Sequence, residues 1–321
     1  MHGSPTLKQL LPLVVLLLAA LVSSLLLPDY FIYIANLLMV YLMLAIGLDI
    51  VMGWAGQFAF AHVAFYGIGV YGTALLHMRL GVPFVIGMPI AALVAVAVAF
   101  LIALPATRLR TVYLALATFA FAECAQWTFR TWDKLTGGPD GLRITSANVL
   151  GFQITNDRQA MPVIAILLVI VLAATLFLRR SKLGRSLFAI RDSEHVAMAS
   201  GIDLKRTKVT ALCISALYAG IAGGASTLFQ SYIHPDNLGA WTLILLLSMV
   251  VVGGSGSVAG VVLGVVLLGL LPEGLRAAPR GLLVWQELIY GLILMLSVIF
   301  MPKGIWGLFG KFPKPGQGSG T

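Results

Sequence analysis

Polar side chains interrupt the long apolar runs of this sequence at only a few positions. Glu123 and Gln126 are three residues apart and would share one face of a helix, where a carboxylate beside an amide can bind an ammonium group. A charged side chain at the centre of a membrane helix costs about 2.5–3.5 kcal/mol on insertion scales, so each such residue requires a partner or a function. The candidates for contact with a bound molecule are His62, Glu123, Gln126, Asp49 and Gln57.

The same residues also have a structural interpretation. Glu123 or Asp49 could pair with Arg130 or with a neighbouring side chain and so hold helices together. A neutral His62 could hydrogen-bond to a backbone carbonyl. The sequence leaves both interpretations open.

The sequence contains no pattern that is typical of a catalytic or metal-binding site. Cys124 and Cys213 lie inside apolar runs without metal-ligand spacing, so we expect both to be small buried hydrophobic residues. There is no H-E-x-x-H pattern and no phosphate-binding G-x-x-x-x-G-K-[ST] loop, because "GGSGS" at 253–257 lacks the lysine. We therefore expect no catalytic residue, no metal and no cofactor in this chain.

The composition defines the class of protein. Hydrophobic residues make up 60% of the 321-residue chain and charged residues 10%, against about 45–50% and about 25% in soluble domains. So apolar a composition is typical of a chain that crosses the bilayer several times, as helices that satisfy their own backbone hydrogen bonds. The net charge of +9 comes without a nucleic-acid motif, so the Lys and Arg residues should mark cytoplasmic loops.

We predict an all-α polytopic membrane protein with about ten transmembrane helices, some of them discontinuous. The run at 10–27 follows Lys8 and lacks a cleavage site, so it should be an uncleaved first helix rather than a signal peptide. The apolar runs lie at 10–27, 31–52, 58–78, 82–105, 111–130, 160–178, 209–232, 238–252, 257–272 and 284–301.

The distribution of Lys and Arg predicts that both termini are cytoplasmic, because that orientation also places the charged loops inside. Residues 1–305 then form one transmembrane domain with a charged cytoplasmic loop at about 179–208, and 306–321 form a cytoplasmic tail. The basic residues that define the inner side are Arg108, Arg110, those of 179–208, Lys303, Lys311 and Lys314.

Glycine-rich stretches predict breaks and close packing. "GWAGQ" at 53–57 and "GGSGS" at 253–257 would end helices within the membrane, or form ordinary turns at its surface. Small residues step by four at Ala216, Gly220 and Gly224, and again at 256, 260 and 264, which favours close helix contacts with this chain or a second subunit. The polar stretch 131–159 predicts an extracellular loop that either docks a partner or is an ordered lid.

The most polar segment, 181–208, predicts two short helices. Leu187, Phe188 and Ile190 supply an apolar face, and Asp192 or Ser193 would cap a second helix that Gly201 ends. So short a helix requires a surface to pack against. A groove in a cytoplasmic partner would supply it; the alternative is a helix lying on anionic lipid headgroups.

This segment resembles the cytoplasmic coupling loop of bacterial ABC-importer permeases, in which a Glu and small residues precede a Gly. Glu194, Ala197 and Gly201 match that pattern, whereas His195 and Val196 stand where two alanines are usual. The stretches "GLDIVMGWAGQFAFAHVAFYGIGVYGTALL", "LRTVYLALATFAFAE", "LTGGPDGL" and "VVGGSGSVAGVVLGVVLLGLLPEGLR" occur in the order seen in LivM-type permeases of branched-chain amino-acid ABC importers. The resemblance covers about Met39 to Pro302.

The resemblance implies a permease subunit of the bacterial inner membrane with several partners. These would be a LivH-type second permease, two LivG- and LivF-type ATPases that hold ATP and Mg²⁺, and an external substrate-binding protein. The chain itself would be a transport subunit and not an enzyme. The residues that the resemblance assigns to ATPase coupling are Arg185, Arg191, Asp192, Glu194, His195, Ala197 and Gly201.

The expected cargo is leucine, isoleucine or valine, with Glu123 facing the ammonium group. Urea, short amides or aromatic acids are the alternative cargo, since similar permeases carry them. An ATP-independent channel and a membrane-embedded enzyme are alternatives of other classes; the enzyme lacks a catalytic constellation in this sequence.

Overall fold

The computed structural model describes residues 27–106, 111–144, 147–149, 152–277, 285–301 and 304–309. Helices dominate this part of the chain. The main ones are α2 (Asp29–Asp49), α3 (His62–Leu80), α4 (Phe84–Ala106), α5 (Thr111–Thr131), α7 (Asp157–Arg180), α8 (Lys182–Asp192), α9 (Glu194–Ala199), α10 (Leu204–Ser226), α11 (Ala240–Gly253), α12 (Val258–Gly269), α13 (Leu271–Ala277) and α14 (Gln286–Phe300).

The all-α membrane fold is confirmed. Each predicted apolar run from residue 31 onward coincides with a helix, whereas the first run, at 10–27, lies outside the described residues except for its last residue. Among the described residues, five segments are long and apolar enough to cross a membrane, and α11 and part of α14 are shorter apolar helices. The number of ten complete crossings therefore stays a prediction.

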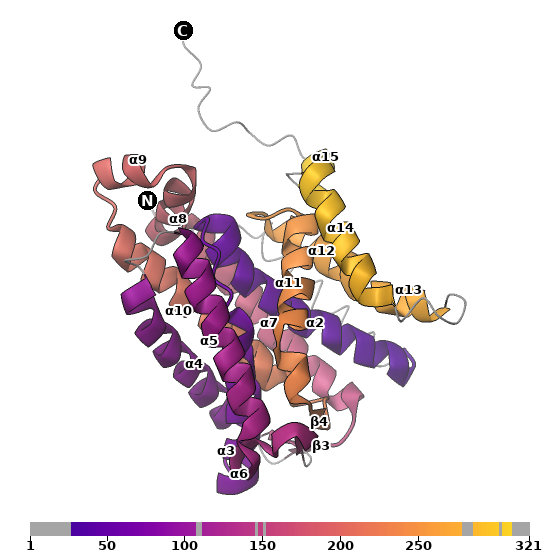
Figure 1. Ribbon diagram of the computed structural model, residues 1–321. Helices are drawn as coiled ribbons and strands as arrows, with labels where there is room; N and C mark the ends of the chain where they lie inside the picture. The colour runs from indigo at the N-terminus through magenta and orange to yellow at the C-terminus, as the bar shows by residue number, and fades with distance from the viewer. Residues whose placement is uncertain are drawn as a thin grey trace.

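Helix α10 has the most extensive packing of the described helices. It packs against α4, α3 and α2 (Figure 1), while α2 also contacts α7, α11 and α12. Gly220 permits a close contact, because a Cβ there would lie 2.6 Å from the Cα of Ala92 on α4. At Gly260 a Cβ would lie 2.7 Å from the carbonyl oxygen of Gly253 on α11. Both small-residue ridges thus pack within this chain.

One member of the second ridge was assigned wrongly. Gly256 does not lie on a helix, because α12 begins only at Val258. Gly256 lies in the preceding turn with a φ of 88°, a left-handed conformation that glycine adopts without the strain that a Cβ would cause. The spacing of four here is a property of the sequence and not of a helix face.

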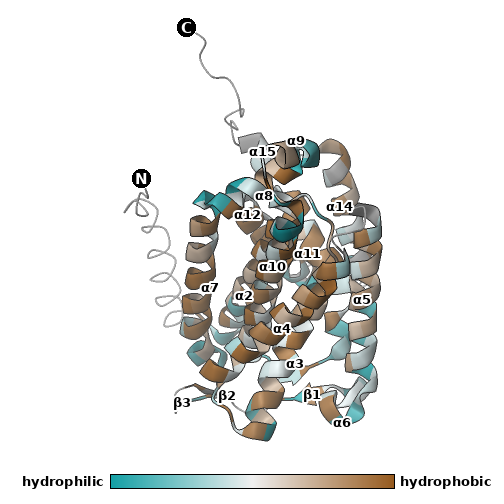
Figure 2. Cartoon of the chain, turned by 90° about the vertical axis from the view of Figure 1, so that its left-hand side faces the viewer, coloured by the Kyte–Doolittle hydropathy of each residue, from teal (hydrophilic) through white to brown (hydrophobic). Residues whose placement is uncertain are grey.

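The two ends of the bundle differ in character (Figures 1 and 2). One end, called the α8 end, carries α8, α9 and the short α15 (Trp306–Phe309), and hydrophilic residues concentrate in α8 and α9. The opposite end, called the strand end, carries α6 (Asp133–Thr136), the 3₁₀ turns η2 (Gly138–Asp140) and η3 (Pro235–Leu238), and the strands.

The polar stretch 131–159 is largely ordered at the strand end. Strand β1 (Leu142–Arg143) pairs antiparallel with β4 (Tyr232–Ile233), with Leu142 opposite Ile233. Strand β2 (Ala147–Val149) forms a hairpin with β3 (Phe152–Ile154). The β1–β4 pair ties this stretch to the segment that follows α10, so the described part of it is a folded cap.

Candidate functional site

Helices α8 and α9 form as their local signals predict. The Ser181 hydroxyl accepts a hydrogen bond from the Gly184 N–H (3.2 Å), and the Ser193 hydroxyl accepts one from Val196 (3.4 Å). Both residues are N-caps, which satisfy backbone donors that the first turn leaves free. Gly201 follows α9 with a φ of 79° and ends it. Of the two predicted caps, Ser193 and not Asp192 is the capping residue.

The apolar face of α8 anchors it to the bundle. Leu187 and Ile190 are almost fully buried, and Phe188 packs against the same core. A buried leucine or isoleucine contributes about 1.5–3 kcal/mol relative to exposure. Helix α8 is therefore fixed to the membrane helices and does not hang free in solvent.

The residues predicted to couple to an ATPase divide into outward-facing and inward-facing groups. Arg185, Asp192 and His195 are exposed, whereas Ala197 is buried against the bundle. The Glu194 carboxylate accepts a hydrogen bond from Lys208 Nζ on α10 at 2.7 Å. Glu194 thus also tethers the start of α9 to α10.

Two apolar side chains on α9 are exposed that the sequence analysis did not single out. Val196 is 65% exposed and Met198 50% exposed, on a short helix that is otherwise surrounded by polar residues. They lie on the two sides of the buried Ala197, and exposed apolar side chains at a polar end are typical of a contact with another molecule. The sequence "HVAM" contains these apolar residues in a polar segment, but Val196 was considered only as a residue that replaces the usual alanine.

Asp49 connects the two glycine-rich interruptions. It is the last residue of α2 and is buried, with 2% of its surface exposed. Its Oδ2 accepts a hydrogen bond from Trp54 Nε1 (3.0 Å), and its Oδ1 accepts one from the backbone N–H of Gly256 (2.7 Å). A Cβ at Gly53 would overlap Asp49 Oδ1. We call Asp49, Gly53, Trp54 and Gly256 the Asp49 junction.

Both interruptions lie near the α8 end and are mostly buried, although Gly56 is exposed. After α2 the chain makes a π-helical turn, η1 (Ile50–Trp54), a geometry that is uncommon and often found at functional sites. Helix α11 has 14 residues, so it rises about 21 Å, less than the roughly 30 Å of a bilayer core. Gly253 and Gly254 are buried, and the Ile305 N–H donates to the Val252 carbonyl at 2.8 Å. The structure confirms that helices end at both stretches, while their depth in the membrane stays a prediction.

Helix α8 reaches the Asp49 junction through two side chains. Arg191 Nη1, in the last turn of α8, donates a hydrogen bond to the Gly53 carbonyl. A Cβ at Gly256 would lie 2.5 Å from the same Nη1. Phe188 stacks on Trp54 with ring centroids 5.3 Å apart. The guanidinium of Arg191 is therefore directed toward the membrane helices.

His62 joins three helices. It is buried at the start of α3; its Nε2 lies 2.9 Å from the Leu44 carbonyl on α2, and its Nδ1 lies 2.8 Å from Ser215 Oγ on α10. A neutral ring satisfies both contacts when Nε2 donates to the carbonyl and Nδ1 accepts from the hydroxyl. Since both ring nitrogens are occupied, the structure supports the structural interpretation of His62.

Glu123 lies on an exposed face of α5. The structure gives its carboxylate no hydrogen bond or ion pair among the described residues, and Arg130 instead lies 3.9 Å from Asp236. Gln126 packs against Gly239, ahead of α11. The exposed face repeats at helical spacing along α5 and contains Tyr113, Leu116, Ala120, Glu123, Trp127 and Arg130.

Cys124 lies beside Glu123 and is exposed, so the expectation that it is buried was wrong. An apolar run in the sequence cannot distinguish a helix inside the bundle from one at its edge, and α5 packs on one side only. Cys213, on α10, is half-buried.

Gln57 has a buried side chain in the segment that follows the π-helical turn. Its backbone N–H donates to the Val51 carbonyl at 3.0 Å. Its Nε2 is buried and has no hydrogen-bond partner within the described part of the chain. The structure therefore places Gln57 beside the Asp49 junction, whereas Glu123 and Gln126 lie on α5.

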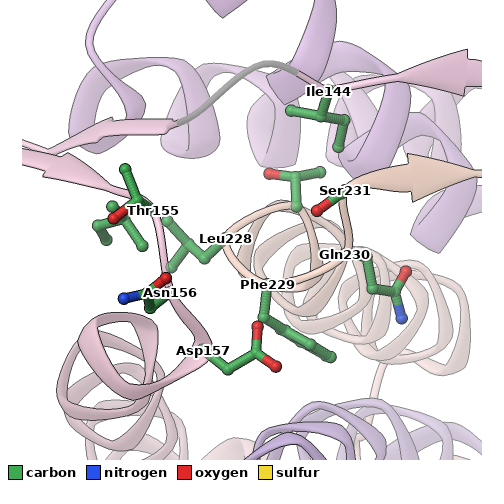
Figure 3. A pocket seen from close by; sticks show the side chains of 10 residues that line it. Ile144, Thr155, Asn156, Asp157, Leu228, Phe229, Gln230 and Ser231 are labelled. Carbon is green, nitrogen blue, oxygen red and sulfur yellow. The ribbon is translucent and has the colours of Figure 1, made fainter.

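A pocket of about 190 Å³ opens at the strand end (Figure 3). None of the residues predicted to contact a bound molecule lines it. Most of its lining residues come from the segment that leads into α7 and from the turn that follows α10. The lining contains both apolar and polar side chains. The lining residues are Ile144, Ile154, Thr155, Asn156, Asp157, Thr227, Leu228, Phe229, Gln230 and Ser231.

This arrangement defines a helical membrane protein with a polar end that carries α8 and α9 (Figure 2). A family model described as a branched-chain amino acid transport system permease component matches residues 30–298. The chain therefore belongs to this permease family.

Individual relatives agree with the family. The chain is 32% identical over 324 residues to the high-affinity branched-chain amino acid transport system permease protein LivM of Escherichia coli (strain K12), covering 94% of this chain and 75% of that protein. It is 30% identical over 137 residues to LivH of the same strain, covering 43% of this chain and 44% of that protein. The xylose transport system permease protein XylH of that strain is 31% identical over 164 residues, covering 48% of this chain and 41% of that protein. No solved structure matches the chain.

The structural role of His62 predicts a stability effect. His62→Leu removes both hydrogen bonds and leaves the Ser215 hydroxyl without its partner, so the free energy of unfolding should fall by about 1–3 kcal/mol. Thermal unfolding of the purified protein in detergent measures this change. His195→Leu on the exposed surface of α9 is the control and should change stability by no more than about 0.5 kcal/mol. Equal stability of the two variants would contradict the role.

Proposed function

We propose that this chain is a permease subunit of an ATP-driven importer that moves leucine, isoleucine and valine across the bacterial inner membrane. The observation that carries the proposal is the similarity to LivM over 94% of the chain. The fold supports it, because the polar end that holds α8 and α9 is firmly attached to the membrane helices. ATP is hydrolysed on separate subunits in this proposal.

The α8 end faces the cytoplasm in the proposed orientation. Arg179 and Arg180 end α7, and further Lys and Arg residues follow on α8 and at the start of α10. Short loops rich in Lys and Arg remain on the cytoplasmic side. The strand end, with the cap and its pocket, then faces the external substrate-binding protein.

The α9 surface is the proposed contact for one of two ATPase subunits. Val196 and Met198 offer exposed apolar side chains on α9, and the exposed polar residue His195 precedes them on the same helix. Exposed apolar side chains beside polar ones are typical of a protein interface. This favours a protein partner over the alternative of a helix lying on lipid headgroups.

The exposed face of α5 is proposed to line the substrate path beside a LivH-type second permease. A carboxylate facing lipid at membrane depth is costly, so Glu123 should face a water-filled path or the second subunit. Its neighbours on this face, such as Leu116 and Trp127, are apolar. A carboxylate for an ammonium group and an apolar wall for a side chain together suit an aliphatic amino acid.

The cargo can be tested with the reconstituted complex of this chain, the second permease, the ATPases and the binding protein. Leucine, isoleucine and valine should each raise the ATPase rate, because ligand delivered by the binding protein favours the arrangement that hydrolyses ATP. Stimulation by urea, short amides or aromatic acids, and none by leucine, would assign the alternative cargo. Uptake in proteoliposomes without ATP would contradict the importer and support a channel.

The role of Glu123 predicts a transport defect. Glu123→Gln removes the charge that faces the ammonium group, a contact worth about 1.5–3 kcal/mol, so the rate of leucine uptake per complex should fall about tenfold or more. The ATPase should still bind, because Glu123 lies on α5 and not on α8 or α9. Cys124→Ser, at the next position on the exposed face, is the matched control. Wild-type uptake by the Glu123→Gln variant would show that Glu123 does not contact the transported amino acid.

A further inference from the structure

The contacts at the α8 end point to a mechanical connection between α8 and four membrane helices. We propose that Arg191 and Asp49 are positioning residues that transmit a displacement of α8 to both interrupted segments of the bundle. The inference rests on the proposed function, because it assumes that an ATPase moves α8 and α9. It concerns residues inside the permease and not the contact with the ATPase.

The Asp49 junction is the point at which the two interrupted segments meet. Asp49 Oδ1 accepts from Gly256, which lies 207 residues away in the sequence, and Oδ2 accepts from Trp54. Through these two bonds the end of α2 and the turn η1 are held to the turn between α11 and α12. Neither segment can move far without breaking a hydrogen bond to a buried carboxylate.

Arg191 adds α8 to this junction. Its Nη1 donates to the carbonyl of Gly53, the residue that faces Asp49, and lies next to Gly256. A Cβ at Gly256 would overlap the Arg191 guanidinium, and a Cβ at Gly53 would overlap Asp49, so the arrangement requires glycine at both positions. One side chain of α8 therefore contacts both interrupted segments.

Phe188 adds a second contact between α8 and the Asp49 junction. It stacks on Trp54, the same indole that donates to Asp49, and the guanidinium of Arg179 lies 5.9 Å from its ring centroid. Arg191 and Phe188 lie three residues apart and so on one face of α8. A shift or rotation of α8 would act on the junction at two points.

The junction lies where helices of the bundle end or begin. Helices α2 and α11 end there, and α3 and α12 begin just beyond it. Packed helices change between discrete arrangements and do not deform continuously, so a small shift of α8 can become a change in the positions of these helices. Residues far from the substrate would in this way set whether hydrolysis produces transport.

The test compares leucine uptake per ATP hydrolysed in the full reconstituted complex. Arg191→Ala should lower this ratio about tenfold, since a hydrogen bond from a charged donor is lost, while ATP hydrolysis continues. Arg191→Lys, which keeps a charged donor, should recover most of the ratio. Lys182→Ala, at the exposed start of the same helix, is the matched control and should keep the wild-type ratio.

A second variant covers the case in which Arg191→Ala does not assemble. Asp49→Asn has nearly the same volume and keeps an oxygen for Gly256, but its amide N–H₂ cannot accept from Trp54. It should also lower uptake per ATP. A wild-type ratio in an assembled Arg191→Ala or Asp49→Asn complex would overturn the inference, as would an equal fall in Lys182→Ala. A wild-type complex without ATP-driven uptake would instead contradict the proposed function.

Discussion

One buried carboxylate organises the end of the molecule at which the proposed function begins. Two membrane segments are interrupted near α8, and an interrupted helix leaves backbone groups that must find partners wherever they are buried. Asp49 accepts from one such group, the N–H of Gly256, and from the indole of Trp54. Without this acceptor, neither interruption would have its present shape.

The other features of this end depend on that junction. The π-helical turn carries Trp54 to Asp49 and turns the Gly53 carbonyl toward Arg191. Helix α8 is held by its buried apolar face, and Glu194 ties α9 to α10 through Lys208. The outer surface of this end is polar, with Val196 and Met198 exposed, and its inner side is attached to the membrane helices. The central bundle, by contrast, depends on glycines such as Gly220 that permit close contact.

The sequence predicted the helices, the caps and the breaks, because each depends on local chemistry: apolar runs, Ser193 before α9, Gly201 after it and two glycine-rich stretches. It could not predict that Asp49 lies against Gly256, because that contact joins distant segments. For the same reason Asp49, Gln57 and His62 were grouped with Glu123, although the structure places them in the packing between helices. The prediction that Cys124 is buried was wrong because an apolar run does not reveal which side of a helix lacks neighbours.

Hydrogen–deuterium exchange of the purified protein tests the Asp49 junction most directly. The account predicts that 253–257 exchanges slowly in the wild type, although it is not helical, and that Asp49→Ala raises exchange there about tenfold or more. Exchange at 50–57 should rise in the same variant. Exchange at 253–257 that is fast in the wild type, or that is unchanged by Asp49→Ala, would contradict the account.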